Sequence, residues 1–145
     1  MVAQIKARGI DGIGVTEHWD REYGFQVKEI VERCFASEVL IIPGREIDIA
    51  ERQEVELYLP DGSIFRFLAH PGFPAGSYVV ENVQGIEIDN YLHDWHIDKP
   101  RVTALAEEHG LLLLRSSDAH SIERIGCYYT EVSLEELSAR ATSAV

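Results

Sequence analysis

The segment LLLLRSSDAH (residues 111–120) carries the clearest architectural signal in the chain. Its first four residues are apolar without alternation, which is typical of a strand buried on both faces in a parallel sheet. A polar loop containing an aspartate and a histidine follows at once. A second run of this kind, VLII (residues 39–42), is followed by the pair Pro43-Gly44, where we expect the strand to end. These runs predict an α/β chain, either a barrel or an open wound sheet.

Helices and strands are expected to alternate along the rest of the chain. Helices are predicted at residues 1–8, around the apolar positions Val27, Ile30, Val31, Cys34 and Phe35, between Pro100 and Gly110, and after Ser133 with Glu136 as a capping box. Strands are predicted at 12–16, 85–89 and 127–132, with a hairpin of 55–60 and 63–69 around the turn Asp61-Gly62. No repeat or linker interrupts this order, so residues 1–145 are predicted to form a single domain.

The net charge of the chain, -12, limits the kinds of partner that we expect. Such an acidic surface repels phosphate backbones, so nucleic acid is an unlikely partner except as a substrate end, and bound cations are favoured. No apolar run approaches the length of a membrane span, and no membrane association is expected. Two cysteines without CxxC spacing and the absence of a signal-peptide pattern predict a cytoplasmic protein. The oligomeric state stays open.

Titratable side chains follow five of the predicted strands. They are Glu17 and His18, Glu46, His70, Glu87 with Asp89, and Asp118 with His120. Because parallel strands end on one face of a sheet, we expect these side chains to converge there. Histidine nitrogens and carboxylate oxygens are ligands of zinc, manganese and iron, so the sequence predicts a site for divalent metal ions. The number of candidates suggests two or three ions, with Glu46 bridging two of them, and such clusters catalyse phosphoryl hydrolysis.

Each of these residues also has a simpler interpretation. A lone histidine after a strand is more often a hydrogen-bonded loop residue than a ligand, and Asp118 could form an Asx turn. His93 and His96 have a chelating spacing but lie in a polar loop, so we interpret them as solvated, and His109 as structural. Other residues are also assigned to roles outside a site: Glu54, Glu56, Glu107 and Glu108 to solvated faces, Cys34 to the core, and Cys127 to an unreactive thiol.

Five segments together resemble successive motifs of the PHP family (polymerase and histidinol phosphatase domains). They are GIDGIGVTEH, IIPGREI, LAHPG, GIEIDN and SSDAHSIERIG, and they occur in the order of the family over nearly the whole chain. The resemblance implies a distorted (β/α)7 barrel with up to three metal ions at the carboxyl ends of its strands. By motif match, the implied metal ligands are His18, Glu46, His70, Asp118 and His120, with Glu87 matching less securely.

The sequence also departs from the family pattern. Family members begin with a strand that carries a His-x-His pair, and no such segment precedes the first predicted helix here. We expect either that the true start lies upstream of Met1, or that this short form binds metal weakly or not at all. Glu17 stands where Asp is commoner, and no basic residue follows His70-Pro71. The barrel is therefore predicted to be truncated at its N-terminus, with partial metal sites.

These features predict a metal-dependent phosphoesterase that acts on a small phosphorylated substrate. Arg45 is the predicted catalytic cation, with Arg115 as an alternative, and His70 or His120 is the predicted proton donor for the leaving group. Two other functions stay open: a non-catalytic PHP-like scaffold, and a metal-dependent amidohydrolase, which uses a similar ligand set on a related barrel.

Overall fold

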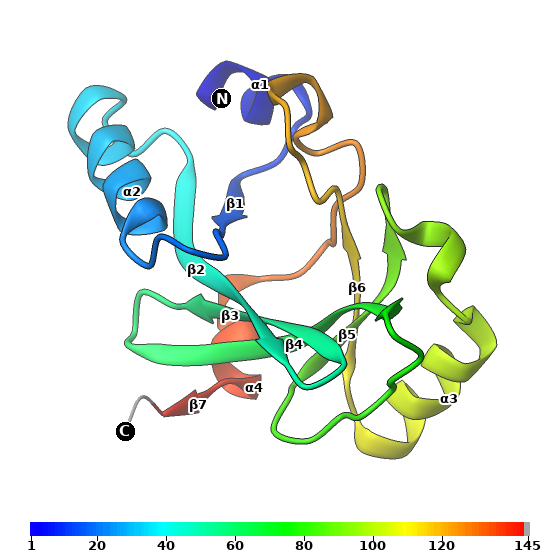
Figure 1. Ribbon diagram of the computed structural model, residues 1–145. Coiled ribbons are helices and arrows are strands. Elements are labelled where there is room, and N and C mark those ends of the chain that lie inside the picture. The colour runs from blue at the N-terminus through cyan, green and yellow to red at the C-terminus, as the bar shows by residue number, and fades with distance from the viewer. Residues whose placement is uncertain (144–145) are drawn as a thin grey trace.

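A computed structural model describes residues 1–143 as a curled sheet with helices around it (Figure 1). The strands are β1 (Gly12–Val15), β2 (Leu40–Ile49), β3 (Arg52–Tyr58), β4 (Ser63–Pro74), β5 (Gly85–Asn90), β6 (Leu112–Ser116) and β7 (Thr142–Ser143). The α-helices are α1 (Val2–Ala7), α2 (Tyr23–Cys34), α3 (Lys99–His109) and α4 (Leu134–Arg140), and two single turns of 3-10 helix are η1 (Asp94–His96) and η2 (Ile122–Arg124).

The sheet follows the order β1-β2-β3-β4-β5-β6, with β7 paired to β4. The β1–β2, β4–β5 and β5–β6 pairs are parallel, whereas β2, β3 and β4 form an antiparallel meander. In the described residues β1 and β6 are the two ends of this path, so the sheet curls without closing (Figure 1). The α/β class is confirmed, while the closed seven-stranded barrel stays a prediction.

Strand β2 does not end at Pro43-Gly44, and this corrects the sequence-based boundary. β1 pairs with β2 up to Pro43, and β3 pairs with β2 from Gly44 onward to Ile49. The Pro-Gly pair is thus the point where β2 changes its partner. Gly44 is required because a Cβ there would lie 2.3 Å from the carbonyl oxygen of Glu56. The longer strand carries Glu46 within the sheet instead of on a loop after it.

Three apolar clusters form the core. One lies between the meander and α4 and includes Phe65 and Phe67, one joins α1, α2 and β2, and one joins β5 to α3. Helix α3 begins at the Asp98 cap and ends at Gly110, whose φ of 65° is easily adopted by glycine. Ser133 Oγ accepts from the Glu136 N–H at the start of α4, so both helix predictions are confirmed.

Other sequence-based assignments were wrong. Residues 127–132 do not form a strand, because the hydroxyl of Thr130 makes the hydrogen bonds to the backbone of Arg115 that a neighbouring strand would make. Cys34 is exposed, since it lies in the last turn of α2 while Val31 faces the core. Glu54 and Glu56 are buried, not solvated. No described helix has the length and hydropathy needed to cross a membrane.

Candidate metal centre

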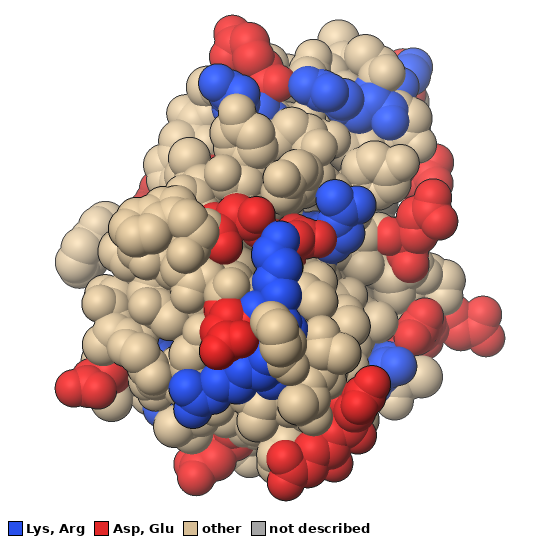
Figure 2. All heavy atoms as spheres, turned by 90° about the vertical axis from the view of Figure 1, so that its right-hand side faces the viewer, with Lys and Arg blue, Asp and Glu red and all other residues tan. Residues whose placement is uncertain are grey.

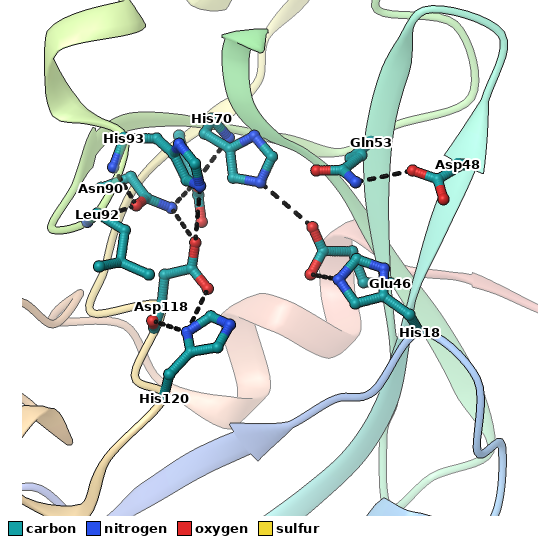
Figure 3. Close-up of polar contacts among 11 residues, drawn as sticks. His18, Glu46, Asp48, Gln53, His70, Asn90, Leu92, His93, Asp118 and His120 are labelled. Carbon is teal, nitrogen blue, oxygen red and sulfur yellow. Dashed lines mark hydrogen bonds and ion pairs between the residues drawn. The ribbon is translucent and has the colours of Figure 1, made fainter. Parts of the chain in front are cut away.

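Four histidines and three carboxylates gather at one edge of the sheet, and Figure 3 shows most of them. His18 follows β1, Glu46 lies in β2, His70 in β4, Glu87 in β5, His93 in the loop before η1, and Asp118 and His120 follow β6. The predicted convergence of strand-end residues is therefore seen in the structure. Glu46 and His70 lie inside strands because β2 and β4 are longer than the sequence indicated.

Glu46 lies between two of the histidines. Its Oε1 is 3.2 Å from His70 Nε2, and its Oε2 is 3.5 Å from His18 Nε2 (Figure 3). His70 is buried, Glu46 is largely buried and His18 is half-buried. A carboxylate that directs one oxygen to each of two histidines has the arrangement needed to bridge two cations, as its motif position predicts.

His70, His93 and Asp118 form the tightest group. Each offers one ligand atom, and these atoms all lie within 4.8 Å of one another. His93 thus belongs to the centre, and its assignment as a solvated loop residue was wrong. The His93 ring is held by aromatic neighbours, with centroids 4.6 Å from the His70 ring and 4.4 Å from the Phe73 ring. The sequence spacing of His93 did not reveal this packing against the rings of His70 and Phe73.

His96 and His120 lie at the periphery. The His96 ring packs against Phe73, with centroids 5.0 Å apart, and it does not belong to the tight group. The side chain of His120 is 73% exposed, and its Nδ1 lies 2.8 Å from the carbonyl oxygen of Asp118. Because a carbonyl oxygen only accepts, this contact requires a proton on Nδ1. His120 is therefore directed toward the centre but stays open to solvent.

Glu87 lies beneath the centre and supports it. It is buried, and its Oε2 accepts from the His70 backbone N–H at 2.6 Å and from Asn90 Nδ2 at 2.9 Å. Burial raises the pKa of Glu87, against the opposing effect of hydrogen bonds from Ser116, His70 and Asn90. Because Glu87 Oε2 already accepts two hydrogen bonds from the protein, the structure gives Glu87 a supporting position. Glu87 does not belong to the group of His70, His93 and Asp118, and its role as a metal ligand stays a prediction.

The electrostatics of the centre favour cations. Burial opposes protonation of His70, but the hydrogen bond to Glu46 and the charges of Glu87, Glu46 and Asp118 outweigh it and raise the pKa of His70. Burial and the neighbouring His70 lower the pKa of His93. In the described part of the chain, no Lys or Arg forms an ion pair with Glu46, Glu87 or Asp118. Among the described residues, the ion-pair partners of Glu46 and Asp118 are therefore histidines.

Two of the central residues adopt positive φ angles, 23° for His70 and 47° for Asp118. Residues other than glycine rarely adopt this conformation, and such strain is concentrated at functional sites. The His70 Nδ1 atom is also buried without a hydrogen-bond partner in the described residues. An unsatisfied buried nitrogen is uncommon, and a bound ion is one of the features that account for it. The donor set and this unsatisfied ring both fit a divalent metal ion.

The two arginines proposed to bind phosphate are engaged elsewhere. Arg45 Nε pairs with Glu56 at 2.9 Å, and because adjacent strand residues face opposite sides, its side chain points away from that of Glu46. Arg115 Nε pairs with Asp89 at 2.8 Å, and Asp89 also contacts Lys99. Acidic and basic side chains are interspersed on the face that Figure 2 shows, with no broad basic surface. The assignment of Arg45 as a catalytic residue is therefore not supported.

Fold and site together define an α/β protein with a His- and carboxylate-rich centre at one sheet edge. Comparisons with known proteins bear on the family and the fold. The family model "PHP-associated" matches residues 96–141. No curated protein matches the chain. The chain is similar to the crystal structure of a "putative metal-dependent phosphoesterase" from Bifidobacterium adolescentis, with a TM-score of 0.74 and 11% identity over 98% of this chain and 90% of that one. The match over residues 96–141 and the likeness in fold both agree with the PHP resemblance of the sequence motifs.

Sequence reasoning missed two members of the centre. The sequence showed His93 as the first residue of a His-x-x-His pair. Its spacing alone did not distinguish a histidine in a folded turn from one in a solvated loop. Asn90 ends the motif GIEIDN, but no role was assigned to it from the sequence. Both depend on contacts among β4, β5 and the loop after β6, which lie far apart in the sequence.

Proposed function

We propose that this protein is a metal-dependent phosphoesterase that hydrolyses the phosphate ester of a small substrate. The observation that carries the proposal is the group formed by Glu46, His70, His93 and Asp118, which is largely buried and has no Lys or Arg partner among the described residues. Carboxylates held together in this way are costly without a balancing cation. The likeness in fold to the Bifidobacterium adolescentis protein supports the same class of function.

Two sets of side chains would hold divalent ions. His70, His93 and Asp118 would hold the first, because their ligand atoms already converge. Glu46 with His18 would hold a second, with Glu46 bridging the two. Zn, Mn or Fe suits a mixture of imidazole and carboxylate ligands. Such an ion supplies positive charge that polarises phosphoryl oxygens and acidifies water.

The residues of the chain have separate tasks in the proposed reaction. Glu46 and Asp118 bring negative charge to the two sides of the centre, and Asn90 and Glu87 hold the backbone beneath it. His120 is exposed at the edge, and with its Nδ1 proton bonded to Asp118 O, its Nε2 is the nitrogen free to exchange a proton with the leaving group. The net charge of -12 favours a small phosphorylated substrate over an extended nucleic acid.

The test compares metal binding and ester hydrolysis in the same preparations. Purified protein is freed of metal, reloaded with Zn²⁺ or Mn²⁺, and assayed with a generic aryl phosphate. Glu46→Gln should lose most metal and at least about 100-fold in rate, as expected for a ligand contact. Asp48→Asn is the matched control, because Asp48 lies two residues along the same strand and bonds only Gln53 in the described structure.

Three outcomes decide the proposal. Metal binding with hydrolysis that depends on Glu46 supports it. Metal binding with hydrolysis of cyclic amides in place of phosphate esters would replace it with an amidohydrolase. If the protein binds neither Zn²⁺ nor Mn²⁺ after reloading, the proposal is overturned. A scaffold function would then be the better account of the fold.

A further inference from the structure

Asn90 lies at the end of β5 under the candidate metal centre, and only 1% of it is exposed. A buried amide must find partners for two N–H donors and for its carbonyl oxygen. In this structure both groups are used, and every partner belongs to the centre or to the turn that supplies it (Figure 3).

The amide nitrogen of Asn90 joins two carboxylates. Its Nδ2 donates to Glu87 Oε2 at 2.9 Å and to Asp118 Oδ2 at 3.3 Å. The same Glu87 oxygen accepts from the backbone N–H of His70 at 2.6 Å. Asn90 thus connects the strand that carries His70 with the loop that carries Asp118, and it limits the rotation of the Asp118 carboxylate.

The amide oxygen of Asn90 shapes the next loop. Its Oδ1 accepts from the backbone N–H groups of Leu92 and His93, both at 3.0 Å. This turn brings the chain back toward the centre directly after β5. It places the His93 ring 4.6 Å from that of His70, centroid to centroid, where a loop without the turn would leave His93 in solvent.

We infer that Asn90 is a positioning residue that sets two of the three ligands in the His70, His93 and Asp118 group. This inference rests on the proposed metal-dependent function. A neutral amide suits the place because it can donate to two carboxylates and accept from two N–H groups without adding charge to an acidic centre. Neither Asp, which has no N–H donors when ionised, nor Ser, which is too short, can make all four bonds. Outer partners of this kind typically change metal affinity by about 10- to 100-fold.

The test uses Co²⁺ as the probe, because its visible absorption reports the geometry of its ligands. Metal-free protein is titrated with Co²⁺, and both the affinity and the absorption spectrum are recorded. Asn90→Ser should bind Co²⁺ about 10- to 100-fold more weakly and give a changed spectrum. Asn82→Ser is the control, since Asn82 is the other asparagine of the chain and lies exposed outside the centre. It should retain both the affinity and the spectrum of the wild type.

A second variant keeps the test decisive if Asn90→Ser does not fold. Asn90→Asp retains the shape of the side chain and the oxygen that accepts from Leu92 and His93, but loses both donors. Its Co²⁺ spectrum should also differ from that of the wild type, because the Asp118 carboxylate is released. Thermal melts of the metal-free proteins show which variants are folded.

The outcomes separate this inference from the proposed function. If the wild-type protein binds no Co²⁺, the proposed function fails and the inference fails with it. If the wild type binds Co²⁺ and the folded Asn90 variants match it in affinity and spectrum, Asn90 does not position the ligands and the inference alone is wrong. A lower melting temperature with an unchanged spectrum would likewise assign Asn90 to folding only.

Discussion

Glu46 and Glu56 lie on neighbouring strands of the same meander, yet they face opposite sides and have opposite surroundings. Glu56, on β3, accepts from Arg45 at 2.9 Å and from Arg66 at 3.0 Å, and Tyr58 OH donates to it at 3.0 Å. Among the described residues, the charged or titratable side chains in ion-pair range of Glu46, on β2, are only His18 and His70. Both carboxylates are largely buried.

This difference separates a structural acid from one that is poised to bind a cation. A buried carboxylate is tolerated when the chain supplies opposite charges, as around Glu56. The group around Glu46 lacks them, so the missing positive charge must come from protonated histidines or from a bound ion. The two faces of one meander therefore allow direct tests, in which changes on one face should affect metal binding and changes on the other should affect stability.

The largest expected effect is on metal affinity after Glu46→Gln. The variant should bind Zn²⁺ or Mn²⁺ at least about 100-fold more weakly, since the bridging carboxylate is lost. The metal-free protein should be as stable as the wild type or slightly more stable, because an uncompensated acid has been removed. Calorimetric titration and thermal melts measure the two quantities. If the variant lost much stability but kept its metal affinity, Glu46 would be a structural acid like Glu56.

The next largest effect is on stability after Arg66→Met. Removing one arginine leaves Glu56 only partly balanced, and we expect a loss of about 2 kcal/mol, below the range for fully buried pairs because Arg66 is partly exposed. Metal affinity should not change. Arg33→Met removes an exposed i,i+4 partner of Glu29 and should cost no more than about 0.5 kcal/mol. Urea denaturation of both variants measures the two free energies of unfolding. Equal losses of stability in Arg66→Met and Arg33→Met would contradict the prediction.

A smaller effect on affinity is expected from His93→Ala. We expect roughly a 10-fold loss, because one of three converging ligands is removed while Glu46, His70 and Asp118 remain. His109→Ala serves as the control, since His109 lies in the last turn of α3 beside Glu108. If metal titration gave the same affinity for both variants, His93 would not be a ligand and would be a solvated loop residue.

The smallest effect concerns pH and Glu56. Burial opposes ionisation of Glu56, but hydrogen bonds from Arg45, Arg66 and Tyr58 outweigh it and lower its pKa from the usual 4.5. A lowered pKa in the folded state gives stability that is present above pH 4.5 and is lost as pH falls through the folded value. The free-energy difference between wild type and Glu56→Gln, measured in urea at several pH values, should therefore be largest near neutrality and narrow below pH 4.5. A difference that widens on acidification would contradict this sign.

Local patterns were sufficient to predict much of the fold. The runs 39–42 and 111–114 indicated buried strands, Asp61-Gly62 a hairpin, and Ser133 a helix start, and all four elements are seen in the structure. The burial expected for residues 111–114 is found only at Leu114, because β6 lies at one end of the described strand order. The same patterns failed at Pro43-Gly44 and at residues 127–132. In both places the outcome depends on a partner elsewhere in the chain, since β3 continues the pairing of β2 and the Thr130 side chain replaces a strand.

The sequence by itself determined the chemistry that the centre can offer. His18, Glu46, His70, Asp118 and His120 follow the apolar runs of the sequence, and parallel strands direct such residues to one edge whatever their detailed packing. The family resemblance also depended on these motifs alone, and it is confirmed.

Only the tertiary structure decided which charges are balanced and which are not. Arg45 and Glu46 are adjacent in sequence, but the alternation of a strand sends one toward Glu56 and the other toward two histidines. His93 joins the centre because the local turn at Asn90 directs it there and because its ring packs against Phe73 and His70, which are distant in sequence. Spacing along the chain places a residue at an edge, whereas its partners and therefore its role depend on the register and packing of segments that are distant in sequence.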